Sequence, residues 1–344
     1  MPSISSERAK QLAAECGFEL AGVTRAEPSP DRDRYLKWTE LGMAGAMSYL
    51  ADRRAHVRTD PKLLLPSARS ILCVGKLYNS AGPYSTECET DDGGWISRYA
   101  WGQDYHDVLR RGLERLVERL REYATFEWKI CVDTAPLLER SYARQAGLGW
   151  IGKNTCLINQ RMGSWFFLGE LLVSLELAAD APAPDRCGTC TRCIDACPTQ
   201  AIVPDAGGWT LDARRCISYF TIELRGTIPE EHRGGIGRNL FGCDICQDVC
   251  PWNRRAPVTE KLAFAPPAAP FELAELANLS SGEFHRRFQN TPVERARYSG
   301  FLRNVAVAMG NSKLEKYREP LKMLAGFEDE QVATHARWAL EQLG

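Results

Sequence analysis

The sequence lacks a long apolar run, a leader-like N-terminus and an excess of charge of either sign. Its N-terminal segment carries Glu7, Arg8 and Lys10 with no apolar stretch behind them, so no secretory or transit peptide is expected. The longest apolar stretch, residues 165–177, is interrupted by a glycine and two glutamates and is too short to span a bilayer. The 43 Lys+Arg and 44 Asp+Glu residues leave a formal charge of −1, so no overall basic excess indicates nucleic-acid binding. These absences favour a soluble, cytoplasmic protein.

Cysteine, in contrast, is abundant, with 13 residues in a chain of 344. An odd count in a chain long enough for two or three domains does not fit a small domain held together by disulfides. In a reducing compartment, clustered cysteines are more often metal ligands than disulfide partners. The spacing of the cysteines therefore becomes the main functional signal.

The first part of the chain alternates expected strands with expected helices, which favours a layered α/β sheet. The helices are residues 6–16, which Gly17 ends, and residues 105–122, which Asp104 caps. A third helix is expected to begin at a Thr134 cap, with Pro136 in its first turn, and to stop near Gly147. The expected strands are Phe18–Thr24, Ile71–Tyr78, Trp128–Asp133 and Trp165–Leu177.

Two Ala/Pro-rich stretches, residues 179–186 and 263–270, read as linkers and divide the chain into three parts. We expect an α/β domain at 1–180, a cysteine-rich domain at 181–262 and a helical domain at 263–344. In the last part, Phe301–Met309 and Gln331–Leu343 are expected helices that stop at Gly310 and Gly344. Their similarity suggests a short solenoid of the HEAT-like kind.

The cysteines form two runs with the spacing of a bacterial ferredoxin. Cys187, Cys190, Cys193 and Cys197-Pro198 follow C-x2-C-x2-C-x3-C-P, and the second run is stretched to Cys216, Cys243, Cys246 and Cys250-Pro251. In such runs the fourth cysteine reaches the other cluster, so we expect two [4Fe–4S] clusters. One takes Cys187, Cys190, Cys193 and Cys250, and the other takes Cys197, Cys216, Cys243 and Cys246. Zinc is the alternative, but it favours paired C-x2-C groups around one ion.

Five cysteines stand outside these runs, namely Cys16, Cys73, Cys88, Cys131 and Cys156. Buried structural thiols are the default interpretation, and Cys88, in a polar loop, is the best candidate for a further role.

Two clusters in tandem move single electrons and need an acceptor, which the remaining motifs do not identify. Residues 147–152 match G-x-G-x-x-G but follow an expected helix rather than a strand, which argues against a dinucleotide site. The same segment ends in Lys153-Asn154, without the Ser/Thr of a P-loop, so both matches are interpreted as accidents of a Gly-rich turn. No D-x-H-x-x-G, the usual lower-ligand motif for base-off cobalamin, surrounds any of the five histidines. The residues alone indicate a reductase or an electron carrier.

Several segments resemble the epoxyqueuosine reductase family over nearly the whole chain. They are residues 133–140, 146–154, 163–170, 216–223 and 242–253. The resemblance implies reduction of epoxyqueuosine to queuosine at the wobble position of tRNA, the last step of queuosine biosynthesis. It also implies kinship with reductive dehalogenases, in which two clusters feed a base-off corrinoid that has no protein histidine ligand. The first domain would then bind cobalamin.

The partners that the resemblance implies are tRNAs with GUN anticodons, those for Asp, Asn, His and Tyr, and an external low-potential electron donor. We expect a monomer that does not bind membranes.

The resemblance also implies site residues. Asp133, at the end of an expected strand, matches the family's proton donor. To act at neutral pH it needs a pKa well above its usual value of about 3.9, which burial against an apolar surface would produce. The alternative is that Asp133 only caps a helix beside Thr134. Positions implied to contact the corrinoid are Arg58, Asp133, Asn154, Leu157, Leu168, Ser218 and Glu223.

Two of these contacts have a simpler explanation, since Leu157 and Leu168 suit plain core packing. Trp101 departs from the family, because a basic residue is expected there.

A local basic stretch is hidden by the neutral total. Residues 281–322 contain nine Lys/Arg and four Glu, a net +5, whereas residues 323–344 carry −3. A basic stripe on helices can follow RNA phosphates, although a solvated helix face is the usual alternative. With an RNA substrate implied, the candidate contacts are Arg225, Arg233, Arg286, Arg287, Arg303, Lys313 and Lys316.

Three other functions stay open at this point. A ferredoxin-type carrier is disfavoured by the large α/β part that precedes the clusters. An RNA-binding protein with structural clusters would need no corrinoid, and a dehalogenase-like corrinoid reductase would act on a small molecule.

Overall fold

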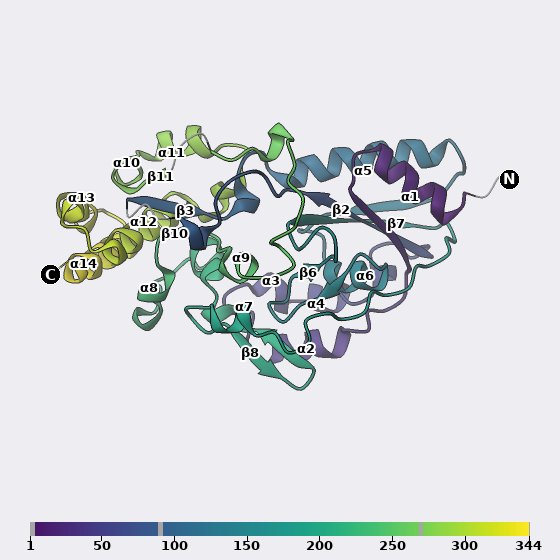
Figure 1. The fold of residues 1–344 in the computed structure, drawn as a ribbon, viewed down its shortest axis with the longest axis horizontal. Helices are drawn as coiled ribbons and strands as arrows, with labels where there is room; N and C mark the ends of the chain where they lie inside the picture. The colour runs from purple at the N-terminus through teal and green to yellow at the C-terminus, as the bar shows by residue number, and fades with distance from the viewer. Residues whose placement is uncertain (1–3, 89–91, 268–270, 344) are drawn as a thin grey trace.

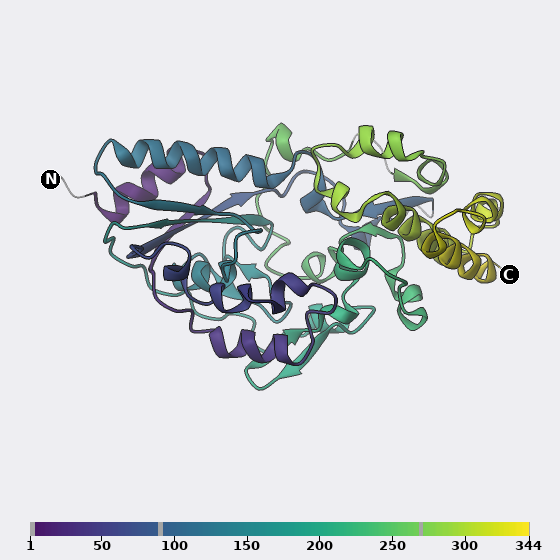
Figure 2. The same ribbon diagram turned by 180° about the vertical axis from the view of Figure 1, so that it is seen from behind.

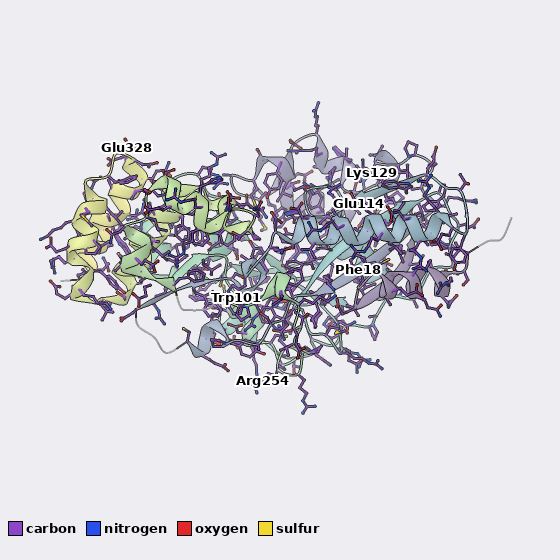
Figure 3. All side chains as sticks on the ribbon, turned by 90° about the horizontal axis from the view of Figure 1, so that it is seen from above. Phe18, Trp101, Glu114, Lys129, Arg254 and Glu328 are labelled. Atoms are coloured by element: carbon purple, nitrogen blue, oxygen red, sulfur yellow. The ribbon has the colours of Figure 1, made fainter. Side chains whose placement is uncertain are left out.

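The computed structural model describes residues 4–88, 92–267 and 271–343, and shows an elongated molecule with its termini at opposite ends (Figure 1). The N-terminal lobe is built on a sheet and the C-terminal lobe on helices. Figure 3 shows this order from above: Phe18 lies in the first lobe, Trp101 near the middle and Glu328 at the far end. Within the described residues, no helix is both long and apolar enough to cross a membrane.

The N-terminal sheet has four strands in the order β1-β2-β7-β4, and every neighbouring pair is antiparallel. Their bounds are Leu20–Arg25 for β1, Ser70–Leu77 for β2, Phe166–Val173 for β7 and Trp128–Cys131 for β4. All of β2 and nearly all of β7 are buried, because both faces of the sheet are covered. Burial on both faces explains why these strands read as continuous apolar runs.

Helices cover both faces of this sheet (Figures 1 and 2). Helices α1 (Ser6–Glu15) and α5 (Tyr105–Arg121) lie on one face and α6 (Glu139–Gln145) on the other. The predicted cap at Asp104 is confirmed, since its carboxylate accepts from the His106 N–H, and Gly17 has the left-handed φ of +93° that was predicted. The layered arrangement is confirmed as well, but the ladders are antiparallel, so the ligand-edge rule for parallel sheets does not apply here.

The predicted start of the third helix is wrong. Helix α6 begins at Glu139, and Leu138 precedes it without a side-chain cap. The Thr134 hydroxyl instead donates to the Val132 carbonyl at 3.3 Å, so it closes a turn directly after β4. Residues 133–138 are thereby left as a loop, and Asp133 lies at its start.

Short elements complete this lobe. Beside the sheet lie α2 (Arg32–Glu40), α3 (Ser48–Ala51), α4 (Arg54–Val57) and the 3-10 turn η1 (Pro61–Leu63). The G-x-G-x-x-G segment follows α6 and leads into a hairpin of β5 (Trp150–Ile151) and β6 (Leu157–Ile158), not into a helix. This confirms that the motif is a Gly-rich turn.

The cysteine-rich region consists mainly of short helices and small ladders. Its elements are α7 (Arg192–Asp195), β8 (Ile202–Asp205), β9 (Gly208–Leu211), η4 (Ala213–Arg215), the π-helical turn η5 (Tyr219–Glu223), α8 (Glu230–Ile236), β10 (Asn239–Phe241) and α9 (Ile245–Asp248).

A segment that follows β2 leaves the first lobe and packs in the second. It comprises η2 (Ser85–Glu87), β3 (Gly93–Ile96) and η3 (Arg98–Ala100). Strand β3 pairs with β10 in parallel and with β11 (Phe271–Glu272) in antiparallel register. Part of the first domain's sequence therefore packs in the second lobe, a pairing that local periodicity does not reveal.

The C-terminal lobe is organised around α12 (Tyr298–Ser312), which is buried continuously from Phe301 to Gly310. Around it and before it lie η6 (Leu262–Phe264), α10 (Leu273–Ala277), α11 (Ser281–Phe288), η7 (Pro292–Ala296), η8 (Glu315–Tyr317), α13 (Arg318–Ala325) and α14 (Glu330–Gln342). Helix α12 packs against α14, and the HEAT-like repeat stays a prediction.

The prediction that Gly310 stops a helix is wrong, because α12 continues through it to Ser312. A Cβ at Gly310 would lie 2.8 Å from the Cα of Ala339, so glycine is needed for the close approach of α14. Gly344, the other predicted stop, lies outside the described residues.

Candidate active site

A cleft of about 730 Å³ opens between the α2–α4 segment, the loop after β4, strand β9 and the turn η7. Aromatic and apolar side chains from residues 35–50 line one wall, and Asp133, Glu139 and Arg295 bring polar groups into the opening. A cavity of this size and mixed lining is typical of a cofactor or ligand site.

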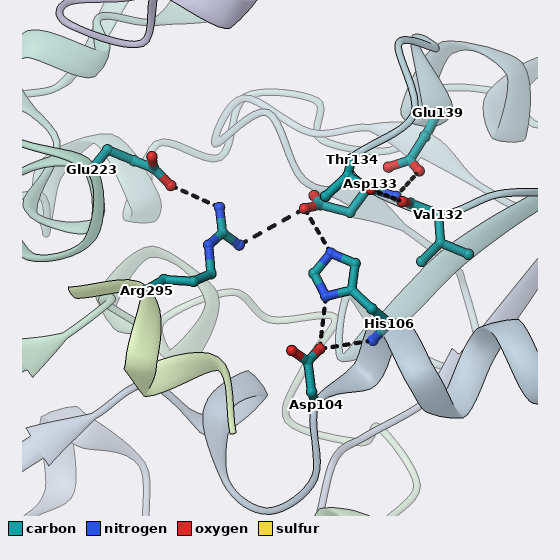
Figure 4. A network of polar contacts seen from close by, with 8 residues as sticks. All are labelled: Asp104, His106, Val132, Asp133, Thr134, Glu139, Glu223 and Arg295. Carbon is teal, nitrogen blue, oxygen red and sulfur yellow. Dashed lines mark hydrogen bonds and ion pairs between the residues drawn. The ribbon is translucent and has the colours of Figure 1, made fainter. Parts of the chain in front are cut away.

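Asp133 lies at the centre of a polar network at this cleft (Figure 4). Its Oδ2 is 3.1 Å from His106 Nε2 and 3.8 Å from a guanidinium nitrogen of Arg295. Its backbone N–H donates to Glu139 Oε1 at 2.5 Å, and its φ is +42°, in the left-handed region that few non-glycine residues adopt. The carboxyl is 41% exposed, so it can reach a molecule in the cleft.

His106 connects Asp133 to a second carboxylate. Its Nδ1 is 2.7 Å from Oδ1 of Asp104, the residue that caps α5. Burial alone would lower the pKa of His106, but the hydrogen bonds with Asp104 and Asp133 outweigh it and raise the pKa to about 9. The imidazole is therefore protonated at neutral pH and carries a positive charge between two carboxylates.

The pKa of Asp133 moves in the direction opposite to the prediction. Burial raises it, but the hydrogen bond from His106 and the charge of Arg295 outweigh burial, so the pKa lies below its usual value. The sequence analysis required a raised pKa at Asp133, whereas here the raised pKa belongs to the neighbouring His106.

A pair of buried carboxyls lies behind the Asp133 loop. Burial, aided by the nearby Asp133 charge, raises the pKa of Glu139 to about 8, and burial next to Glu139 raises that of Glu170 well above its usual value. Glu170 lies on β7 and is fully buried. The pair therefore retains protons at neutral pH and avoids two adjacent buried charges.

Of the predicted cofactor contacts, Arg58 and Asp133 line the cleft. Arg58 is 6% exposed, its guanidinium lies 6.0 Å from the ring centre of Tyr49, and its buried Nε meets no hydrogen-bond partner among the described residues. A buried cation with an unsatisfied donor is typical of a site that binds an anionic or amide-bearing ligand.

The other predicted cofactor contacts lie away from the cleft wall. Leu157 and Leu168 belong to the core beneath the sheet, in agreement with the alternative that they only pack in the core. Asn154 is buried and donates to the Cys246 carbonyl at 3.2 Å, and the Ser218 side chain hydrogen-bonds to the thiol of Cys216. Glu223 accepts from Arg295 at 2.8 Å, which links it to the Asp133 network.

The cysteines of the two runs gather in the predicted groups. The thiol of Cys193 lies near those of Cys187, Cys190 and Cys250. The thiol of Cys243 interacts with those of Cys197 and Cys216, and that of Cys246 with those of Cys216 and Cys243. No three His, Cys, Asp or Glu side chains in the described ranges form a group that could hold a metal ion. The fit to the clusters therefore rests on the proximity of eight thiols in two sets of four, each set with three cysteines from one run and one from the other.

The Gly-rich turn and its hairpin hold the cysteine loops in place. Lys153 Nζ donates to the carbonyls of Gly188 and Cys190 at 2.8 and 2.9 Å, and Trp150 packs edge-on against Trp252. The segment interpreted as an accidental match therefore has a structural purpose beside the first cysteine run.

Two of the five single cysteines, Cys73 and Cys131, are fully buried in the sheet, as the default interpretation has it. Cys156 is not isolated, because its thiol hydrogen-bonds to that of Cys246. Trp101, the departure from the family, is buried and packs against the Arg98 guanidinium at 4.6 Å, away from the cleft.

Two of the predicted RNA contacts are wrong. Arg303 is 1% exposed and donates to the carbonyls of Leu224 and Gly226, and Arg233 is 5% exposed and donates to the Ile228 carbonyl. Backbone carbonyls inside the lobe accept from both terminal nitrogens of Arg303, and the Arg233 guanidinium packs over the ring of Trp338, so both residues lie within the lobe rather than on its surface.

The remaining basic candidates lie on the surface. Arg225 is exposed, although its guanidinium donates to the carbonyls of Arg295 and Ala296. The other four candidates are exposed on α11 and around η8, namely Arg286, Arg287, Lys313 and Lys316.

The sequence analysis missed His106, Arg295 and Glu139 as site residues. Asp104-x-His106 at a helix start could have drawn attention to the histidine. Arg295 counted only as part of the basic stretch, and Glu139 only as part of a family segment. Nothing local in the sequence shows that these residues meet Asp133.

Comparisons with known proteins agree with this geometry. Residues 58–134 match the family model "Epoxyqueuosine reductase QueG, DUF1730", and residues 186–253 match the 4Fe-4S double cluster binding domain. Epoxyqueuosine reductases of Xanthomonas campestris and Pseudomonas aeruginosa are 41% and 42% identical to this chain. The alignments span all of this chain and 97% and 96% of the relatives.

Solved structures agree over nearly the same length. An epoxyqueuosine reductase crystallised with an epoxyqueuosine-modified tRNA-Tyr stem loop superposes with a TM-score of 0.89 at 32% identity, over 98% of this chain and 90% of that one. A Bacillus subtilis epoxyqueuosine reductase, with its catalytic aspartate loop swung out of the active site, gives 0.88 at 31% identity over the same shares. Full-length identity, fold and cysteine grouping together show that the chain belongs to the epoxyqueuosine reductase family.

Proposed function

We propose that this chain reduces epoxyqueuosine to queuosine in tRNA. The observation that carries the proposal is the full-length match to a structure that holds an epoxyqueuosine-modified tRNA stem loop. The overall reaction breaks two C–O bonds, forms a carbon–carbon double bond and releases water. It consumes two electrons and two protons, so the protein must bring an electron path and a proton donor to one oxygen atom.

The electron path is two [4Fe–4S] clusters in residues 186–253. Cys187, Cys190, Cys193 and Cys250 would hold one, and Cys197, Cys216, Cys243 and Cys246 the other. The grouping of the thiols supports this assignment. An external low-potential donor would load the clusters.

The cleft fits a corrinoid. Its aromatic wall can pack against a flat macrocycle, and the unsatisfied buried donor of Arg58 can meet a polar substituent of the ring. When bound there, cobalamin would supply low-valent cobalt as the final reductant of the epoxide. Arg58 would hold the ring, and Asp133 would face the side on which the substrate lies.

Asp133 is the group that delivers protons in this proposal. It is the exposed carboxyl at the centre of the network, and the loop that carries it is closed by its N–H bond to Glu139. In the Bacillus subtilis relative the catalytic aspartate loop is swung out of the active site, which supports a movable loop around Asp133.

The proposed RNA contacts are surface residues: Arg286 and Arg287 on α11, Lys313 at the end of α12, Lys316 on η8, and Arg225. Such contacts would position the stem loop through its phosphates, while the modified base leaves the stack to enter the cleft.

Anaerobically purified protein tests the proposal directly. It should contain about eight irons, as two such clusters require, bind cobalamin, and convert epoxyqueuosine-containing tRNA when a strong reductant is supplied. Conversion by protein free of cobalt would overturn the corrinoid part. Protein with clusters and cobalamin that leaves the modified tRNA unchanged would overturn the assigned substrate.

A further inference from the structure

Asp104, His106 and Asp133 form a row of hydrogen-bonded side chains, in which only Asp133 has a role in the proposed function. Asp104 is 30% exposed and His106 is 21% exposed, so the row runs from a partly solvated carboxylate to the cleft. His106 Nδ1 is held by Asp104 at 2.7 Å, which leaves Nε2, 3.1 Å from Asp133 Oδ2, as the donor toward the cleft. Its ring stacks on Tyr105 with 4.2 Å between centroids, so the imidazole cannot rotate freely.

We infer that His106 stores the proton that Asp133 delivers to the epoxide oxygen, and that Asp104 positions His106 for this transfer. The inference rests on the proposed function, because it assumes that Asp133 faces the substrate. It extends that function by assigning the proton store to His106 and leaving Asp133 as the group that passes protons on.

The charges around the row support this division. His106 faces carboxylates on both sides, whereas Asp133 faces the cations of His106 and Arg295. The proton therefore rests on the imidazole, in agreement with the raised pKa of His106 and the lowered pKa of Asp133. The titratable and charged groups that face the row from its neighbouring elements are Asp104, Asp133, Arg295, Glu223, Glu139, Tyr99 and Tyr105.

The reaction needs two protons, and Asp133 alone can hold one. In the first transfer, the Nε2–H proton moves to Asp133 Oδ2, and Asp133 gives it to the oxygen as the first C–O bond breaks, which leaves a hydroxyl group. His106, now neutral, takes up a proton from solvent. The reloaded row protonates that hydroxyl as the second C–O bond breaks and water leaves. The two electrons come from the low-potential donor of the proposed function, through the two clusters.

Glu139 is the competing proton store, since burial also keeps it protonated. Its carboxyl, however, accepts from the backbone N–H of Asp133 and does not contact the Asp133 carboxyl in this structure. A proton on Glu139 has no direct path to Oδ2, whereas His106 is bonded to that atom. The geometry therefore favours His106.

The test is His106→Gln, measured in holoenzyme by single-turnover conversion of bound modified tRNA. Glutamine can still donate to Asp133 but cannot store a proton. We expect a loss of about 10²-fold or more at neutral pH. We also expect the wild-type rate to fall as pH rises through about 9 and the variant to lack this fall. His285→Gln is the matched control, because His285 is paired with Glu294 at 2.8 Å but is 71% exposed on α11.

A second readout does not depend on activity. Diethyl pyrocarbonate reacts with the neutral form of an imidazole and not with the protonated form. Its rate of modification at His106, mapped by mass spectrometry from about pH 6 to about pH 10, therefore follows the titration of that ring. In Asp104→Asn the titration should move to lower pH by about one unit, and the basic limb of the rate should move with it. Cobalamin absorbance and tRNA affinity should stay unchanged in both variants.

The outcomes separate the two proposals. If wild-type holoenzyme converts the tRNA and Asp133→Asn does not, but His106→Gln keeps the wild-type rate or its basic limb, the proton store is overturned and the proposed function stands. A slow His106→Gln variant that keeps the limb shows a structural role and also overturns it. If wild-type holoenzyme fails to convert the tRNA, the proposed function itself is wrong.

Discussion

Arg295 and Arg303 are close in the sequence but serve opposite purposes in two regions of the molecule. Arg295 lies at the cleft, where it pairs with Glu223 at 2.8 Å and approaches Asp133 at 3.8 Å. Arg303 lies in the core around α12, where backbone carbonyls and the side chain of Asn304 accept its hydrogen bonds.

The partners explain the difference. In the cleft the charges face groups that can gain or lose a proton, so a substitution there changes protonation and chemistry. In the core the charge faces dipoles that cannot titrate, so a substitution there changes stability. The four predictions below test this contrast.

Asp133→Asn should have the largest effect. The amide cannot take a proton from His106, so turnover should fall by about 10²- to 10⁴-fold while iron content and cobalamin binding are retained. Single-turnover conversion of modified tRNA measures the rate. Asp107→Asn, on the exposed side of α5, is the matched control and should behave like the wild type. Wild-type turnover in Asp133→Asn would remove the aspartate from the proton path.

Arg303→Met should destabilise the C-terminal lobe by about 2–4 kcal/mol, because buried carbonyls of residues 220–226 lose their donor. Denaturant unfolding measures the change, and Arg286→Met on exposed α11 should stay within about 0.5 kcal/mol of the wild type. A stable Arg303→Met variant with weakened tRNA binding would contradict the assignment of Arg303 to the core.

Gly310→Ala should cost about 1–3 kcal/mol, since the added methyl group would overlap the backbone of α14. The same unfolding experiment checks it. Gly282→Ala, near the start of exposed α11, has space for a methyl group, with its nearest atom at 3.5 Å, and should be neutral or slightly stabilising. Equal effects at both glycines would show that helix packing does not set the requirement at Gly310.

Joint substitution of Arg286 and Arg287 by Ala should have the smallest effect. Each lost phosphate contact should lower the salt dependence of tRNA binding by about one unit in the logarithmic slope. Folding stability should fall by no more than about 1 kcal/mol, the contribution of the surface ion pair between Arg287 and Glu275. Titrations of tRNA at several salt concentrations measure the slope. An unaltered slope would move the RNA footprint away from α11.

Local patterns predicted the strands of the first lobe well. Runs of β-forming residues between polar or Gly/Pro boundaries placed β1, β2, β4 and β7 within a few residues of their observed bounds, because each run depends on neighbouring residues alone. The same patterns misplaced the start of α6 and the end of α12. At Thr134 the hydroxyl bonds back to Val132, and at Gly310 a distant helix sets the need for glycine.

Charge counting along the chain was the weakest guide to the site. It placed Arg303 among the RNA contacts and Arg295 among undistinguished basic residues. Linear charge density carries no information on which side of a helix faces the core, and α12 is buried on all sides from Phe301 to Gly310.

The sequence by itself determined the cysteine runs, the main elements of the sheet and the family, since these depend on spacing within short segments and on identity along the chain. Only the tertiary structure decided that His106, Arg295 and Asp133 meet at one cleft and that two carboxylates raise the pKa of His106. These residues come from α5, η7 and the loop after β4, and the protonation of each depends on charges that long-range packing brings within hydrogen-bond or ion-pair distance.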